Sequence, residues 1–195
     1  MQKPDLQITQ HNDSKTILGF WVYLMTDLIM FAVLFATYAA LKTSTFGGPG
    51  PSELFSLNGA LAETLILLTS SFTCGLAMLA AHRQNKNQTI IWFLVTLALG
   101  LTFLGLELKE FSQLIAEGHT WQKSAFLSSF FALVSTHGLH IAIGSLWIVV
   151  AIKQIYSRGL TPFITSKLTR LSLFWHFLDI VWIFIFTIVY LMAKV

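Results

Sequence analysis

Eight ionisable side chains lie inside long apolar stretches of this 195-residue sequence. An ionisable group in the hydrocarbon of a bilayer costs at least about 2.5 kcal/mol on insertion scales, so each one needs a partner or a function. Six of them form pairs three positions apart, which puts both members on one face of a helix. Helical bundles use the same spacing to build carboxylate–histidine metal sites. The eight residues are Asp27, Glu63, Glu107 with Glu110, His137 with His140, and His176 with Asp179.

Depth along the helices argues against a metal ion shared by the three pairs. At about 1.5 Å per residue, counted from the cytoplasmic end of each span, Glu107 lies roughly 25 Å up, His140 about 18 Å and His176 about 8 Å. Metal–ligand bonds are only about 2 Å long, and His137 with His140 alone supplies too few ligands. We therefore expect no metal site in this chain.

Haem is the second cofactor that the histidines could hold, because membrane cytochromes ligate haem between helices. Axial ligation needs two histidines at similar depth on different helices. His140 and His176 differ by about 10 Å on the same count, and His82 sits at the edge of its span. Helix tilt shifts such depths, so a haem-b membrane cytochrome is kept as an alternative.

The favoured interpretation is that the polar groups pair across helices in two layers. The outer layer, at roughly 22–27 Å, holds Glu63, Glu107 and His137. The inner layer, near about 15 Å, holds Asp27, His140 and Asp179. Carboxylate–imidazole hydrogen bonds there are each worth about 0.6–2 kcal/mol. Replacing Glu107 with Ala is then expected to destabilise the protein, because its imidazole partner is left unpaired. A proton-conducting chain through the same groups is the other interpretation.

The elements that position these groups are five predicted transmembrane helices. The chain is 55% hydrophobic and 11% charged, whereas a soluble domain carries about 25% charged residues. A bilayer core needs roughly 20 apolar residues in a helix. We predict an all-α membrane bundle over residues 17–195, after a polar cytoplasmic segment over residues 1–16, with spans at about 17–41, 57–81, 90–111, 125–152 and 171–192. In the fourth span Gly138 and Ala142 form a small-xxx-small pair that lets a neighbouring backbone approach closely.

The distribution of Lys and Arg predicts the orientation. With the N-terminus in the cytoplasm, the inner segments hold Lys3, Lys15, Arg83, Lys86, Lys153, Arg158, Lys167 and Arg170. The opposite side holds Lys42, Lys109, Lys123 and Lys194. Five spans then place the C-terminus in the periplasm.

Other features of the sequence carry little chemistry. The single cysteine, Cys74, lies in an apolar run and is expected to be a packing residue. The sequence has no Walker loop, no Gly-x-Ser-x-Gly, no His-Glu-x-x-His and no dinucleotide fingerprint. The spans are not interrupted by Gly or Pro at mid-depth, which disfavours a transporter with broken helices.

Four segments, in order along the chain, resemble subunit III of haem–copper oxidases. They read GFWVYLMTD over residues 19–27, GLELKEF over 105–111, STHGLHIAIG over 135–144 and FWHFLDIVW over 174–182. The likeness extends over about residues 19–192. The branch that the chain most resembles is subunit III of bacterial cytochrome bo-type ubiquinol oxidases, which also has five spans and not the seven of mitochondrial relatives.

This resemblance implies a subunit of a proton-pumping terminal oxidase that oxidises ubiquinol and reduces oxygen to water. Haems and copper then belong to subunit I, and this chain is a non-redox subunit with no cofactor and no catalytic residue. The resemblance implies contact with subunit I, with subunits II and IV and with membrane phospholipids, but not with nucleic acid. It places the chain as a multi-pass protein in the bacterial inner membrane, where it stabilises subunit I and supports proton uptake. Subunit III of a cytochrome c oxidase is the alternative, because the electron-accepting site is not in this chain.

Overall fold

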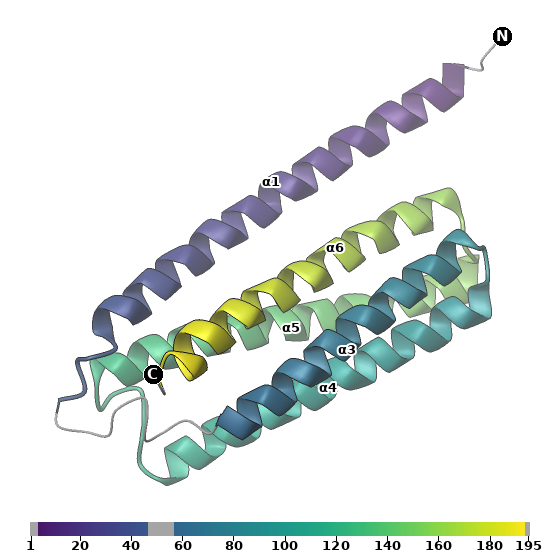
Figure 1. Ribbon diagram of the computed structural model, residues 1–195. Coiled ribbons are helices and arrows are strands. Elements are labelled where there is room, and N and C mark those ends of the chain that lie inside the picture. The colour runs from purple at the N-terminus through teal and green to yellow at the C-terminus, as the bar shows by residue number, and fades with distance from the viewer. Residues whose placement is uncertain (1–3, 47–56, 194–195) are drawn as a thin grey trace.

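The computed structural model describes residues 4–46 and 57–193, with side chains from Lys15 onward. The described residues are helical apart from turns and short connections (Figure 1). The helices are α1 (Pro4–Leu41), α3 (Leu57–His82), α4 (Lys86–Ala116), α5 (Ala125–Arg158) and α6 (Pro162–Ile185), and α6 continues into the π-helical turn η1 (Phe186–Leu191).

Within the described residues five helices are long and apolar enough to cross a membrane, which confirms the prediction of an all-helical protein with five spans. The helices run beyond the apolar stretches because polar residues cap their ends. Ser124 and Thr161 accept hydrogen bonds from backbone N–H groups in the first turns of α5 and α6. The second cap, followed by Pro162 at a favourable first-turn position, begins α6 nine positions before the expected residue 171. The loop between α5 and α6 is therefore shorter than the sequence indicated.

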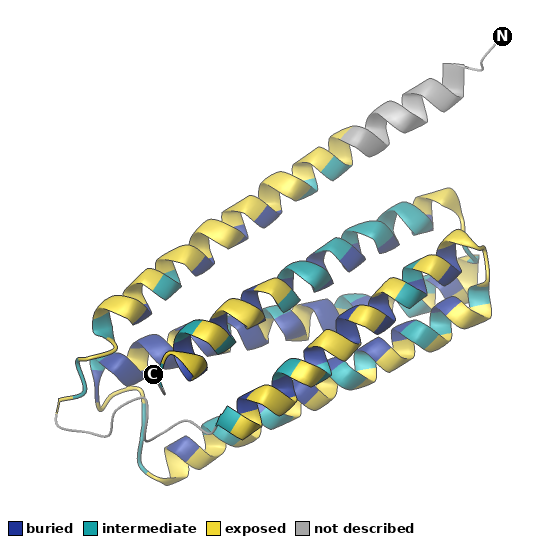
Figure 2. Cartoon of the chain, in the orientation of Figure 1, coloured by how far each residue is buried: buried dark blue, intermediate teal, exposed yellow. Residues whose placement is uncertain are grey.

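Helices α3, α4, α5 and α6 form a four-helix bundle, and α1 lies against α5 and α6 (Figure 1). Within the described residues α1 buries a single stripe of side chains, and most of its surface is exposed (Figure 2). Its four buried residues, three to seven positions apart, share one helix face; they are Leu24, Asp27, Phe31 and Tyr38. One of the eight ionisable residues therefore belongs to the contact between α1 and the bundle.

Trp175 of α6 fixes the spacing of the bundle. A Cβ added at Gly100 of α4 would lie 2.8 Å from the indole ring, and one at Gly144 of α5 would lie 3.1 Å from it. The indole Nε1 donates a hydrogen bond to Ser70 Oγ of α3 at 3.0 Å. A single buried side chain thus contacts the three other helices of the bundle, and two glycines provide the space for its ring.

Candidate functional site

The outer layer gathers three carboxylates and a tyrosine. Glu63 comes from α3, Glu107 and Glu110 from α4, and Tyr190 from η1. The Tyr190 hydroxyl donates to Glu110 Oε2 at 3.2 Å. Glu63 and Glu107 are 5% and 3% exposed. Glu63 and Glu110 line a cleft of about 170 Å³ between α3 and α4, so this layer reaches the surface of the bundle.

Glu107 packs against a glycine of α5. A Cβ added at Gly138 would lie 2.6 Å from Glu107 Oε1 and 2.8 Å from Oε2. Neither carboxylate oxygen has a hydrogen-bond partner among the described residues. The small residue predicted to admit a neighbouring backbone therefore admits a carboxylate side chain.

His137 is enclosed by aromatic rings and forms no hydrogen bond with a described residue. Its imidazole stacks on Trp182 with ring centroids 5.4 Å apart, and Phe103 meets it edge-on at 5.9 Å. The predicted bond between His137 and Glu107 is therefore not formed. Successive residues on a helix point about 100° apart, and the residue that faces Glu107 is Gly138, one position further on.

The inner layer contains one of the expected pairs. His140 Nε2 of α5 lies 3.8 Å from Asp27 Oδ2 of α1, which is a close polar contact but longer than a hydrogen bond, and Asp27 Oδ2 has no hydrogen-bond partner among the described residues. His140 Nδ1 lies 2.7 Å from the carbonyl oxygen of Thr136. A carbonyl oxygen can only accept, so Nδ1 carries a proton and Nε2 is the atom directed at the carboxylate.

His176 and Asp179 do not join that pair. His176 Nδ1 makes a 2.6 Å hydrogen bond with Ser71 Oγ of α3, and Asp179 Oδ1 is buried without a partner among the described residues. Asp179 therefore does not complete the inner layer that was predicted with Asp27 and His140.

Hydroxyl groups of α3 are the partners that sequence reasoning missed. Trp175 donates to Ser70, His176 bonds Ser71, and Trp182 donates to Thr64 at 3.1 Å. Trp182 lies seven positions after Trp175 on α6, whereas its partner Thr64 lies six positions before Ser70 on α3, as expected for two antiparallel neighbours. No feature of the sequence marks these three hydroxyls, because serine and threonine occur in every span and most of their hydroxyls bond a carbonyl of their own helix.

Within residues 4–46 and 57–193, no group of three or more His, Cys, Asp or Glu side chains is arranged to hold a metal ion. Cys74 is fully buried and lies 3.8 Å from Ser172 Oγ, in keeping with a packing role. The chemistry that the arrangement supports is hydrogen bonding and burial of neutral or paired groups between helices.

Long apolar helices that enclose acids and imidazoles define an integral membrane protein of the polytopic, helix-bundle class. The profile of the family described as Cytochrome c oxidase subunit III matches residues 8–194. The chain belongs to this family.

The names of similar proteins agree with this family assignment. The chain is 56% identical over 178 residues to cytochrome bo(3) ubiquinol oxidase subunit 3 of Pseudomonas aeruginosa, covering 91% of this chain and 85% of that protein. It is 49% identical to quinol oxidase subunit 3 of Bacillus subtilis, covering 91% and 87%. It is 44% identical to cytochrome c oxidase subunit 3 of Bacillus sp. (strain PS3), covering 98% and 92%. The resemblance inferred from four motifs is thereby confirmed.

Proposed function

We propose that this chain is the non-catalytic third subunit of a terminal ubiquinol oxidase, with haems and copper held by subunit I. The observation that carries the proposal is its 56% identity, along nearly the whole chain, to a relative named as subunit 3 of a ubiquinol oxidase. The buried polar groups support it, because several of them bond other helices of the same bundle. In this proposal the chain stabilises subunit I and brings no redox centre of its own.

The proposal also covers the location of the chain in the cell and the subunits that it contacts. The chain crosses the bacterial inner membrane with its N-terminus in the cytoplasm, contacts subunit I and meets subunits II and IV. The exposed apolar surface of α1 and the outer face of α5 supports burial against lipid and other subunits. An open, mainly apolar cleft of about 450 Å³ between α4 and α5, with Phe111, Trp121 and Phe131 among its lining residues, offers space for acyl chains.

Support of proton uptake is the part of the proposal that concerns the ionisable residues. Under this orientation Asp27 and His140 lie in the half of the bundle nearer the cytoplasm. Their side chains face one another with 3.8 Å between His140 Nε2 and Asp27 Oδ2, so a small approach would bring the imidazole and the carboxylate into hydrogen-bond contact. The outer carboxylates Glu63 and Glu110 line a cleft at the opposite end. We propose a proton-related role for the inner pair and a structural role for Glu107 and His137.

The proposal is tested by deleting this chain from the oxidase. We expect the remaining complex to keep its haem spectrum but to assemble poorly or lose turnover. Loss of a haem band while the other subunits are fully present would contradict a non-redox role. A Soret band from the chain purified alone would support the haem-b alternative.

A cytochrome c oxidase is the second candidate complex, favoured by the relative of that name at 44% identity. The two candidates differ in the second subunit, which carries copper ligands when the donor is cytochrome c. The reading frames beside this one therefore distinguish them. A second subunit with a complete set of copper ligands would replace ubiquinol by cytochrome c in the proposal and leave the accessory role unchanged.

A further inference from the structure

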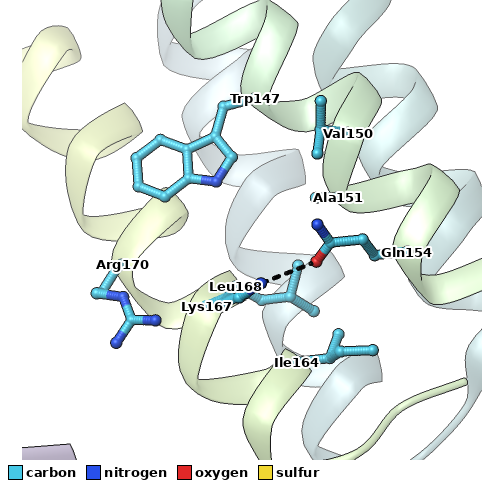
Figure 3. A pocket seen from close by; sticks show the side chains of 8 residues that line it. All are labelled: Trp147, Val150, Ala151, Gln154, Ile164, Lys167, Leu168 and Arg170. Atoms are coloured by element: carbon cyan, nitrogen blue, oxygen red, sulfur yellow. Dashed lines mark hydrogen bonds between the residues drawn. The ribbon is translucent and has the colours of Figure 1, made fainter. Parts of the chain in front are cut away.

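Two clefts of about 170 Å³ each lie at opposite ends of the bundle and differ in charge. Figure 3 shows the cleft between α5 and α6, where Lys167 and Arg170 lie and Lys167 donates a hydrogen bond to Gln154 at 3.4 Å. The cleft between α3 and α4 is instead lined by Glu63 and Glu110. The chain itself supplies a partner for the lysine of the first cleft, but the acids of the second cleft are less well supplied.

The acids of the α3–α4 cleft are buried without a counter-charge. Glu63 is 5% exposed, and its Oε2 has no hydrogen-bond partner among the described residues. The Tyr190 hydroxyl donates to Glu110 Oε2, which leaves Oε1 for a second donor. Among the described side chains no Lys or Arg nitrogen lies within 4.0 Å of either carboxyl group. Buried acids in this state favour an additional donor, and a cationic donor most of all.

The shape of the cleft leaves space for such a donor. Gly59 and Ala62 line it on the α3 side, and their small side chains keep the acids within reach from outside. Lys109 also lines the cleft, but it is exposed and offsets the acidic charge only in part. A water molecule takes up about 30 Å³ in the liquid, so a volume of about 170 Å³ admits a guanidinium or ammonium group.

The acids lie a short distance below the ends of their helices. Glu63 is six residues after the start of α3 at Leu57. Glu110 is six residues before the end of α4 at Ala116. At 1.5 Å per residue each acid is about 9 Å from the helix end. The long apolar stem of an Arg or Lys side chain can pass along hydrocarbon to such a depth, whereas a free ion would first have to lose its water.

We propose that the cleft of Glu63 and Glu110 receives an arginine or lysine side chain from a neighbouring subunit of the oxidase. The cationic group donates hydrogen bonds to both carboxylates, and an arginine can do so with two N–H groups at once. Glu107 is not part of the contact, because it does not line the cleft. The inference rests on the proposed function, which supplies the neighbouring subunit, and it identifies a docking point for that subunit on this chain.

A protein side chain fits the cleft better than other cations do. Within residues 4–46 and 57–193, no group of three or more His, Cys, Asp or Glu side chains is arranged to hold a metal ion. The ammonium group of an aminophospholipid is joined to a phosphate, which would bring a negative charge beside Glu63 and Glu110. A lysine or arginine brings a positive charge alone, and its backbone remains in the neighbouring helix.

The experiment uses the whole oxidase containing the double variant Glu63→Gln/Glu110→Gln, which keeps the shape of both side chains. The matched control is Glu107→Gln/Glu117→Gln, which removes two acids from the same end of the bundle but none from the cleft lining. The affinity of this chain for the remaining subunits is measured by dilution in detergent and native mass spectrometry. We expect roughly tenfold to hundredfold weaker affinity in the first variant, as for the loss of one hydrogen bond to a charged group, and little change in the control.

A second measurement identifies the partner. Each Lys or Arg near the outer ends of the neighbouring subunits' spans is changed to Gln, both in the wild-type complex and in the Glu63→Gln/Glu110→Gln variant. We expect one of these changes to weaken the wild-type complex but to have little further effect in the variant, because the contact is already lost there. If none of the cations is coupled to the two acids in this way, the inference is wrong.

The remaining outcomes also contradict the inference. Unchanged affinity in the first variant would mean that the two acids are buried without a partner. Equal weakening in the two variants would indicate a general effect of charge at this end of the bundle. Loss of bound phosphatidylethanolamine or of a bound metal ion from the first variant, with the affinity between subunits unchanged, would assign the cleft to a lipid or to an ion. Failure of the wild-type chain to co-purify with the oxidase would instead contradict the proposed function.

Discussion

In the inner half of the bundle His176 and His140 each make a polar contact with a side chain of another helix, Ser71 and Asp27 respectively. In the outer half His137 is surrounded by aromatic rings, and Glu107 rests against Gly138. Both halves bury the same types of group, but the two inner imidazoles make polar contacts with other helices, whereas His137 and Glu107 of the outer half are held mainly by the groups packed around them. Since a lipid-embedded interface gains mainly from close packing and only modestly from hydrogen bonds, the outer half is expected to be the more sensitive to changes of volume.

Among the variants that compare the two halves, Trp182→Ala is expected to cause the largest loss of stability. The indole is fully buried, stacks on His137, meets Phe103 with ring centroids 4.7 Å apart and donates to Thr64. Its removal leaves a cavity and should cost about 3–5 kcal/mol, measured as loss of thermal stability of the purified complex. Trp21→Ala, at a residue that is 44% exposed on α1, is the control. Equal losses for the two variants would mean that the outer half is not held by shape.

Gly138→Ala tests the same half by adding volume. The new methyl group would lie 2.6 Å from Glu107 Oε1, and overpacking of this kind costs about 1–3 kcal/mol. Gly105→Ala is the matched control, since nothing lies within 4 Å of its added Cβ, and helix propensity favours that change by up to about 1 kcal/mol. Adding Glu107→Ala to Gly138→Ala should restore part of the stability. If the double variant is less stable than either single variant, the contact described between these residues is wrong.

The fold could be predicted because apolar length and charge count act over 20 or more residues at a time. Five spans follow from that signal, and an error of a few residues at the end of each span does not change their number. The start of α6 was displaced because Thr161 and Pro162 stabilise a helix end within polar sequence, where hydropathy has no signal. Caps of this kind are local, and a search for apolar stretches does not register them.

The pairing of the buried groups could be predicted only in part. The depth of a residue along its helix specifies its layer but not the direction in which its side chain points. Asp27 and His140 were placed in one layer and do meet. Glu107 and His137 were also placed in one layer, but their side chains point to different neighbours, and a rotation of one position separates them. The expected cost of Glu107→Ala was attributed to an unpaired imidazole, and that reason does not hold because His137 forms no hydrogen bond with any described residue.

Ser71→Ala tests the inner half and is expected to cause a smaller loss of stability. The hydroxyl makes the 2.6 Å bond to His176 Nδ1, and hydrogen bonds between transmembrane helices average about 0.6 kcal/mol with a maximum near about 1.7. We expect a loss in that range, together with a coupling of similar size in a double-mutant cycle with His176→Phe. Thr69→Ala is the control, since its hydroxyl bonds only Leu65 of its own helix. A coupling of zero would remove the main difference between the two halves.

Glu107→Gln should have the smallest effect and separates shape from charge most directly. The amide has the shape of the carboxyl group, so the contact with Gly138 is kept, and no described residue donates a hydrogen bond that would be lost. A neutral group is also less costly than an ion at this depth. We therefore expect stability within about 0.5 kcal/mol of the wild-type complex and unchanged turnover. A clear loss of turnover with intact assembly would give Glu107 a role in proton movement, and the outer layer would then differ from the inner one by chemistry as well as by packing.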